Sequence, residues 1–331
     1  SNYNYYFANT IGNCRGNSMK NYLKILSGSS NPELAEEISN QLDISPTRRT
    51  IVRASNDNIK VKIEESVRED DVFVVQTSSP PVNDHLIELL MLIDALKYAS
   101  ARRITAVLPY YPYVRSDKKD EPRISISARL VADLLQAAGA DRILTITLHS
   151  PQIVAFSRIP VDQLWATGLI CDFMRRQNLG KAVVVSPDVG SADEAGTYAR
   201  RLDLPLAIMD KRRHADDEKA EIQNIIGDID GRDALLFDDE VLTGGSMMEA
   251  IRILKDKGAR RILAGCTHGI FSGQALQRID DSPVEVFATT NTIPLPTGKP
   301  REKIEVLSVA RLLSDSIKAI HHGESVSRIV G

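Results

Sequence analysis

The sequence predicts an α/β protein of two tandem domains, each a mostly parallel sheet flanked by helices. Short apolar segments alternate with amphipathic ones along most of the chain, as in β-α repeats of a parallel sheet. The motif Ala101-Arg-Arg-Ile104 returns as Ala259-Arg-Arg-Ile262, each time between a helical pattern and a strand-like run. A length of 331 residues also exceeds what a single hydrophobic core usually serves.

Uninterrupted apolar runs indicate buried parallel strands, and apolar residues spaced three or four apart indicate helices. In the first half we expect strands at 23–26, 71–76, 104–108 and 143–147, and helices at 32–42, 86–98 and 126–138. In the second half we expect strands at 182–185, 206–209, 234–237, 262–264 and 284–288, and helices at 192–202 and 247–257.

We expect the domain boundary near residues 160–167, with an N-terminal domain over 19–161 and a C-terminal domain over 162–307. The last segment, 308–331, is expected to pack back on the first domain. Residues 1–18 are polar, aromatic and aperiodic, so we take Met19 as the natural start and expect an expression-derived or disordered leader before it. Because no low-complexity linker separates the halves, we expect a packed interface between them.

Composition narrows the possible function. Lys and Arg number 41 against 44 Asp and Glu, which gives no electrostatic reason to expect nucleic acid or an anionic membrane as partner. No apolar run reaches the roughly 18 residues of a membrane span. The three cysteines, Cys14, Cys171 and Cys266, have the wide and unpatterned spacing of a protein from a reducing cytoplasm.

The most informative motif is Phe237-Asp-Asp-Glu-Val-Leu-Thr-Gly-Gly-Ser246. Asp238 and Asp239 follow an apolar run, and Thr243, Gly244, Gly245 and Ser246 open a helical pattern. A helix start with glycines favours a bound phosphate, and paired carboxylates suit ribose hydroxyls or a magnesium shell. The motif is neither a Walker A loop nor G-x-G-x-x-G. The alternative is a plain acidic turn before a glycine-started helix.

Four other strand exits carry candidate chemistry, since ligands bind beyond the carboxyl ends of parallel strands. The tyrosine-rich loop with Arg115 suits a nucleobase and phosphates, or is simply a solvated loop. His149 and Asp188 would flank one magnesium shell if they are neighbours, although a lone histidine is more often structural. Lys211 and Arg213 lie in a charged segment that would close over a transferring phosphate, or form an exposed hairpin.

Taken together, these segments resemble the ribose-phosphate pyrophosphokinase family over essentially the whole chain after Met19. The matching stretches are Ser27-Gly-Ser-Ser30, Pro81-Val-Asn-Asp84, Pro112-Tyr-Val-Arg115, Asp117-Lys-Lys119, Leu148-His149 with Gln152, Ser186-Pro-Asp188, Lys211 with Arg213, Thr267-His-Gly-Ile-Phe-Ser-Gly273, Asn291-Thr-Ile-Pro294 and Gly323-Glu-Ser-Val-Ser327. So many matches in the same order are highly specific.

The resemblance implies two phosphoribosyltransferase-like domains and a cytoplasmic enzyme that transfers the β,γ-diphosphoryl group of Mg-ATP to ribose 5-phosphate. It further implies a homo-oligomer of dimers assembled into a hexamer. By position, it assigns Lys211 and Arg213 to catalysis; Asn56, Asn58, Arg115, Ser116, Asp120 and His149 to ATP; Asp238, Asp239, Thr243, Gly244, Gly245 and Ser246 to ribose 5-phosphate; His149 and Asp188 to magnesium; and Ser66, Arg68, Ser325 and Ser327 to an allosteric phosphate or ADP site.

Five positions depart from the family pattern: Leu242 replaces an Asp, Asn58 a Glu, Ser116 a Gln, Thr147 an Asp and Ser191 a Gly. Leu242 is the most serious departure, because an apolar side chain cannot accept a hydrogen bond from a hydroxyl. The departures leave open a second reading, in which the chain is a nucleotide-binding regulatory subunit of weak or no activity. A generic phosphoribosyltransferase is a third and weaker reading, since it leaves the N-terminal half without a role.

Overall fold

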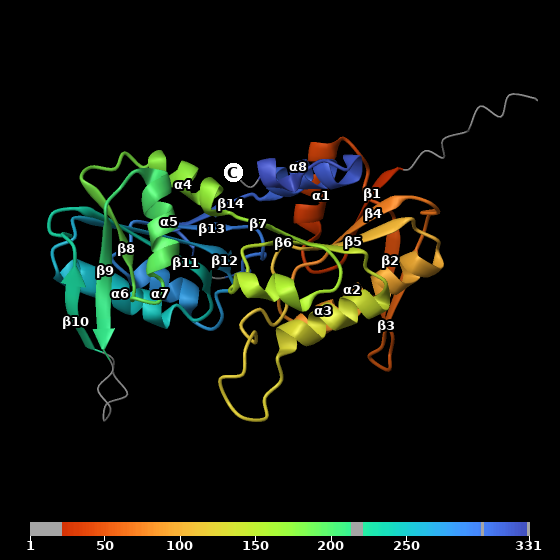
Figure 1. Cartoon of the computed structure of the whole chain (residues 1–331), viewed down its shortest axis with the longest axis horizontal. Coiled ribbons are helices and arrows are strands. Elements are labelled where there is room, and N and C mark those ends of the chain that lie inside the picture. The colour runs from red at the N-terminus through yellow and green to blue at the C-terminus, as the bar shows by residue number, and fades with distance from the viewer. Residues whose placement is uncertain (1–21, 213–220, 299–300, 330–331) are drawn as a thin grey trace, which may run out of the picture.

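The computed structural model describes residues 22–212, 221–298 and 301–329, with backbone only at 211–212 and 221–224. The expected leader at 1–18 lies outside these residues. Two sheets of five and seven strands form the two halves of the molecule (Figure 1), and a separate two-stranded sheet belongs to the first half. The predicted architecture of two mostly parallel sheets flanked by helices is confirmed.

The N-terminal sheet has the strand order β1-β4-β5-β6-β7, and all of its strand pairs are parallel. Its strands are β1 (Leu23–Ser27), β4 (Asp71–Val75), β5 (Arg103–Leu108), β6 (Arg142–Ile146) and β7 (Val161–Leu164). The helices of this half are α1 (Pro32–Leu42), α2 (Val82–Tyr98), α3 (Ser127–Ala138) and α8 (Ala310–His322), with the short 3₁₀ helices η1 (Pro151–Phe156) and η2 (Val326–Arg328).

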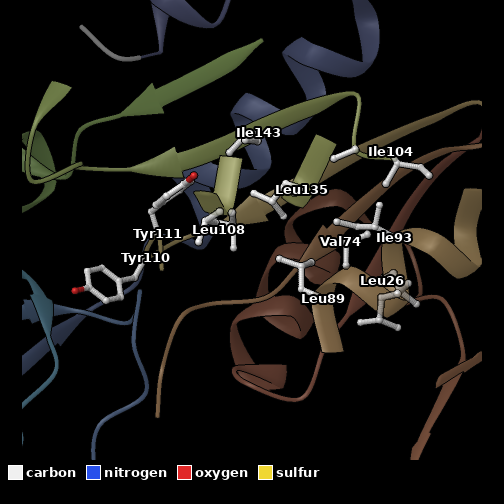
Figure 2. Packing of buried hydrophobic residues seen from close by; sticks show 14 of the residues in the cluster. Leu26, Val74, Leu89, Ile93, Ile104, Leu108, Tyr110, Tyr111, Leu135 and Ile143 are labelled. Carbon is white, nitrogen blue, oxygen red and sulfur yellow. The ribbon is translucent and has the colours of Figure 1, made fainter. Parts of the chain in front are cut away.

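The helices cover both faces of this sheet, with α1 and α8 above the strands and α2 and α3 below them in Figure 1. Alternate residues of β4 divide between the two cores: Phe73 packs with α1 and α8, whereas Val74 packs with α2 and α3. Figure 2 shows the second core, in which Leu89 and Ile93 of α2 meet Val74. Burial on both faces explains why these strands read as continuous apolar runs.

The C-terminal sheet has the order β10-β9-β8-β11-β12-β13-β14, parallel except for the β9–β10 pair. Its strands are β8 (Ala182–Ser186), β9 (Leu206–Arg212), β10 (Glu221–Ile226), β11 (Asp233–Val241), β12 (Arg261–Gly269), β13 (Val286–Thr290) and β14 (Ile304–Leu307). Its helices are α4 (Thr167–Arg175) and α5 (Ala192–Leu202) on one face, and α6 (Gly245–Asp256) and α7 (Ala275–Asp281) on the other.

The sequence reading missed the hairpin of β2 (Arg49–Arg53) and β3 (Ile59–Ile63), and also β7, β10, β14, α4, α7 and α8. The hairpin strands alternate exposed and half-buried residues, so they lack the apolar run of the central strands. The strands β7, β10 and β14 lie at sheet edges. The two helices α4 and α7 are 9 and 7 residues long, too short for a clear helical period.

The chain changes sheet after β7, which pairs with β6 in the first sheet and ends at Leu164. This is three residues later than the division at 161 that the sequence suggests. After β14 the chain returns to the first half, where Leu313 and Ile317 of α8 join the core that contains α1. No helix of the described residues is long and apolar enough to cross a membrane.

The repeated Ala-Arg-Arg-Ile motif holds an aspartate at the start of the neighbouring strand in each half. Arg103 pairs with buried Asp71 of β4, through bonds of 2.8 and 2.5 Å. Arg260 pairs with buried Asp233 of β11, through bonds of 2.7 and 2.6 Å. The repeat thus places an arginine against this aspartate in both halves, through the second arginine of the motif in the first half and chiefly through the first in the second half, where Arg261 lies 3.6 Å from Asp233.

Asp233→Ala is expected to lower the free energy of unfolding by about 2–3 kcal/mol, because Asp233 also accepts from the Gly180 N–H at 2.9 Å. Burial alone would raise the pKa of Asp233, but Arg260 and the Gly180 N–H outweigh it and lower the pKa. The contribution of this carboxylate is therefore present above the unfolded pKa and lost as the pH falls through the folded pKa.

Urea unfolding measured from neutral to acid pH checks this prediction. The exposed helix pair of Arg129 and Asp133 supplies the control, since Asp133→Ala should leave the midpoint unchanged. Equal losses in Asp233→Ala and Asp133→Ala would contradict it, as would an unchanged acid limb in Asp233→Ala.

Candidate functional site

The candidate site lies where β11 leaves its sheet. The strand runs through the acidic pair to Val241, rather than ending at Phe237 as expected, since Glu240 and Val241 still pair with β12. Gly244 follows with a φ of 74°, a left-handed conformation that favours glycine, and α6 begins at Gly245. The backbone N–H groups of this first turn face the end of the helix, as a phosphate site requires.

A brace from α7 fixes this loop. Arg278 donates from Nη1 to the carbonyl oxygen of Thr243 at 3.0 Å, and the Ser272 N–H donates to the Leu242 carbonyl at 2.9 Å. The sequence reading missed Arg278, because nothing in the chain near it signals a contact with the glycine loop. These two bonds tie both carbonyl groups of the loop to the segment around α7.

His149 and Asp239 come together at this edge of the sheet. The Nδ1 atom of His149 lies 2.6 Å from Oδ2 of Asp239, and Asp239 in turn donates its backbone N–H to Oδ1 of Asp238 at 2.9 Å. Since an ionised carboxylate only accepts, Nδ1 of His149 carries the proton. The two halves of the molecule thus meet in a pair that joins the exit of β6 to the exit of β11.

The two adjacent carboxyl groups have opposite pKa shifts. Burial, followed by the hydrogen bond and charge of Asp239, raises the pKa of Asp238 well above its usual range. Burial would also raise the pKa of Asp239, but its bonds with His149 and Asp238 outweigh it and lower the pKa. The bond to Asp239 in turn raises the pKa of His149. Asp238 is therefore the neutral member and Asp239 the ionised member of the pair.

A third carboxyl group faces the acidic pair. Burial and the charge of Asp239 raise the pKa of Glu194, in the first turn of α5, to about 7. The sequence reading did not select Glu194, since an acidic residue in the first turn of a helix is ordinary. Glu194 therefore adds a third carboxyl group to the two that the motif places at this edge of the sheet.

The tyrosine-rich loop reaches this site through Glu240. The Tyr110 hydroxyl donates to Oε2 of Glu240 at 2.7 Å, and Nε of Arg115 lies 3.3 Å from Oε1. Figure 2 shows Tyr110 turned away from the core residues around it and toward the second half of the molecule. The structure thus brings Arg115 to the β11 edge as the strand-end argument expects, and Glu240 is a contact that the sequence reading missed.

Buried His268 on β12 stands beside Glu240 in the sheet register and packs against Tyr110, with ring centroids 4.7 Å apart. Its Nε2 lies 3.1 and 2.9 Å from the carbonyl oxygens of Ile146 and Thr147, and Nδ1 lies 2.9 Å from the Thr292 hydroxyl. Carbonyls only accept, so Nε2 carries the proton. Burial lowers the pKa of His268 to about 4, so the ring is neutral.

The other residues assigned to ATP occupy two separate places. The Ser116 hydroxyl donates to the Ser125 carbonyl at 3.0 Å and accepts the Ser127 N–H at 3.2 Å, which closes the loop that carries exposed Asp120. Asn56 and Asn58 lie exposed in the turn between β2 and β3. Among the described residues, no hydrogen bond or ion pair joins that turn to the β11 site.

Asp188 follows β8, the neighbour of β11, at the same edge of the sheet. Its Oδ1 accepts from the Ser191 N–H at 2.8 Å and lies 3.1 Å from the Ser191 hydroxyl, so it closes the turn that leads into α5. The described residues contain no group of three His, Cys, Asp or Glu side chains that could hold a metal. A magnesium ion here would take most ligands from phosphates and water, which is its usual habit.

The remaining assignments lie partly outside the described residues. Lys211 belongs to β9, where its backbone pairs with Ile222 of β10, and Arg213 falls in the segment that is not described. Ser325 and Ser327 are exposed, with their hydroxyls 2.6 Å apart, beside the end of α8. Ser66 and Arg68 are exposed before β4, and no described bond links them to Ser325 or Ser327.

Three of the five departures have a local structural role. Ser191 bonds to Asp188 in the turn before α5, and Ser116 makes the loop-closing bonds described above. Thr147 has a φ of 40° and is buried beside Thr267, with the two hydroxyl oxygens 3.4 Å apart. Leu242 is half-buried, and its side chain has no polar atom to replace a carboxylate.

Comparisons with known proteins match both halves of the chain. A family model described as the N-terminal domain of ribose phosphate pyrophosphokinase matches residues 23–139, and one described as the phosphoribosyl synthetase-associated domain matches residues 213–330. A ribose-phosphate pyrophosphokinase of Deinococcus radiodurans is 46% identical over 318 residues, which cover 95% of this chain and 99% of that protein. A putative ribose-phosphate pyrophosphokinase of Streptomyces coelicolor is 46% identical over 310 residues, 93% of this chain and 97% of that one.

Among solved structures, phosphoribosylpyrophosphate synthetase from Mycobacterium smegmatis superposes with a TM-score of 0.86 at 40% identity. The superposition covers 92% of this chain and all of that one. Its extent includes both halves and the edge between them, so the likeness concerns the whole two-domain arrangement.

Proposed function

This chain belongs to the ribose-phosphate pyrophosphokinase family, and we propose that it transfers the β,γ-diphosphoryl group of ATP to the anomeric hydroxyl of ribose 5-phosphate. The O–P bond forms between the anomeric oxygen and the β-phosphorus, and the bond between that phosphorus and the α-phosphate oxygen breaks. The products are phosphoribosyl pyrophosphate and AMP, and the hydroxyl proton is released. The enzyme is thus a diphosphokinase.

One observation carries the proposal: Asp239 and Glu240, on the strand that leads into the glycine loop, contact His149 and Arg115 of the other half. Ribose 5-phosphate placed along β11 would have its hydroxyls at Asp238 and Asp239 and its phosphate at Thr243 to Ser246. The neutral carboxyl of Asp238 can donate as well as accept, whereas ionised Asp239 only accepts. Two such groups suit a pair of vicinal hydroxyls.

ATP would then approach from the tyrosine-rich loop, with Arg115, Ser116 and Asp120 near its phosphates or base. Asn56 and Asn58 would reach the nucleotide from the β2–β3 turn. In-line diphosphoryl transfer depends on position and charge neutralisation rather than on covalent help from the protein. Lys211 and Arg213 would supply that positive charge beside the transferring group.

Magnesium fits this edge with His149 and Asp188 as the protein groups that would hold it. Because Nδ1 of His149 is bound to Asp239, Nε2 is the ring nitrogen that would bind the metal, as in histidines oriented by a carboxylate. Bound magnesium would neutralise phosphate charge during transfer.

We further propose a cytoplasmic homo-oligomer, built from dimers into a hexamer, with ATP and ribose 5-phosphate as its ligands and neither nucleic acid nor membrane as partner. Cys171 and Cys266 are buried and unpaired, which suits a reducing compartment. An allosteric phosphate or ADP would involve Ser66, Arg68, Ser325 and Ser327, the exposed groups set apart from the β11 site.

The experiment supplies ribose 5-phosphate and Mg-ATP and separates the products. We expect AMP and phosphoribosyl pyrophosphate in equal amounts, and no AMP when ribose 5-phosphate is left out. Release of ADP or free phosphate would contradict the proposed transfer of a diphosphoryl group. No product at saturating substrate would favour the non-catalytic regulatory subunit.

Leu242→Asp tests whether the leucine weakens the site. A carboxylate restored here should tighten ribose 5-phosphate by about 1–3 kcal/mol, the worth of one charged hydrogen bond. The measurement is the Michaelis constant for ribose 5-phosphate, with Leu242→Asn as the uncharged control. An equal or higher constant in Leu242→Asp would mean that repulsion from the neighbouring carboxylates outweighs the new bond.

A further inference from the structure

We propose that Glu240 is a positioning residue that couples the two substrate loops: through Tyr110 and Arg115 it transmits occupancy of the ribose-phosphate strand to the ATP loop. The inference rests on the proposed function, which places ribose 5-phosphate beside Asp239 and ATP beside Arg115. Glu240 follows Asp239 directly on β11 and is only 7% exposed. Its carboxylate contacts Tyr110 and Arg115, which both belong to the other half of the molecule.

Tyr110 makes the first of the two links, and its side chain is held at both the hydroxyl and the ring. The Tyr110 hydroxyl donates at 2.7 Å to a buried oxygen, and the ring lies 4.7 Å from that of His268, the cross-strand neighbour of Glu240. His268 is itself held by the carbonyls at the end of β6. Tyr110 therefore cannot leave Glu240 without disturbing two strands of two different sheets.

Arg115 makes the second link, and its exposed side chain is the one that can move when ATP binds. Its Nε lies 3.3 Å from Oε1 of Glu240, an oxygen that is buried and makes no hydrogen bond among the described residues. The Arg115 side chain is 58% exposed, so most of the guanidinium remains open to a ligand. A buried acceptor with one loose charged partner gains most when that partner is drawn in.

The consequence is a mutual effect between the substrates. Sugar bound along β11 fixes Asp239 and the residue after it, and Glu240 then holds Arg115 in the position that ATP needs. By linkage, each substrate must increase the affinity for the other by the same factor. Without Glu240 both sites would still form, but each would bind without regard to the other.

Calorimetry tests this without turnover. The ligand is α,β-methylene-ATP, in which a methylene bridge between the α and β phosphorus atoms cannot be cleaved, so no diphosphoryl group is transferred. Its dissociation constant is measured with magnesium in the presence and absence of ribose 5-phosphate. For the wild-type chain we expect the sugar to tighten the analogue by about tenfold, within the usual range of coupling. Tyr110→Phe and Glu240→Leu should reduce this ratio to about one, and Glu240→Gln, which still accepts from Tyr110, should give an intermediate ratio.

Tyr111→Phe is the matched control. Tyr111 is the next residue of the same loop, is also buried, and donates its hydroxyl to the Ala128 carbonyl at 3.0 Å rather than to Glu240. It should lose as much thermal stability as Tyr110→Phe while keeping the wild-type ratio. A wild-type ratio in Tyr110→Phe and Glu240→Leu would overturn the coupling, as would independent binding in the wild-type chain. A wild-type chain that binds neither ligand would instead overturn the proposed function.

Discussion

Asp239→Asn is expected to lower kcat/KM by about 10²–10³-fold, the usual cost of removing one preorganised electrostatic partner from a transfer site. The reason lies in its two roles. Asp239 is the ionised acceptor for a ribose hydroxyl, and it also holds the His149 ring through the 2.6 Å bond to Nδ1. The uncharged amide of asparagine is a weaker acceptor for the Nδ1 proton, so it would orient the His149 ring less firmly.

Asp238→Asn is the matched comparison one residue away. Because the raised pKa of Asp238 keeps that carboxyl neutral, asparagine is nearly an isostere of the form already present. We expect a loss of less than about tenfold here, set against the large loss in Asp239→Asn. Steady-state kinetics of both variants, with circular dichroism to verify folding, decide the matter. Similar losses in the two variants, or the larger loss in Asp238→Asn, would refute the division of roles.

The central strands and the glycine loop could be predicted because their signals are local. Burial on both faces leaves an apolar run in β4 and β11. The φ of 74° at Gly244 favours glycine, and two adjacent glycines are visible in the sequence at this point. The β2–β3 hairpin was missed for the converse reason. Its strands pair only with each other, so they alternate half-buried and exposed residues without a continuous apolar run.

The contacts between the halves could not be predicted, because they depend on how two separate sheets meet. Glu240 looks like one more charge after an acidic pair, yet it receives Tyr110 from 130 residues away. His268 sits in an apolar strand, and its partners at Ile146 and Thr147 are more than 120 residues distant. Periodicity reports which face of an element is buried, but not which distant side chain covers it.

The second large expected effect is a loss of turnover when Lys211 or Arg213 is removed. Lys211→Ala and Arg213→Ala should each lower kcat by about 10²–10³-fold, while the dissociation constant of ribose 5-phosphate changes little. Diphosphoryl transfer places negative charge on oxygens between the two domains, and a cation there contributes most in the transition state. The effect should therefore fall on kcat more than on binding of the sugar.

The position of β9 gives the physical basis for this expectation. Its backbone pairs with β10 as far as Lys211 and Arg212, and on its other side β9 pairs with β8, the strand that leads to Asp188. Lys211→Arg keeps the charge and should recover part of the rate, whereas Lys257→Ala, at the exposed end of α6, should change nothing. If Lys211→Ala weakened ribose 5-phosphate as strongly as it slowed turnover, the lysine would act in ground-state binding, because a loss confined to the transition state leaves the sugar's dissociation constant unchanged.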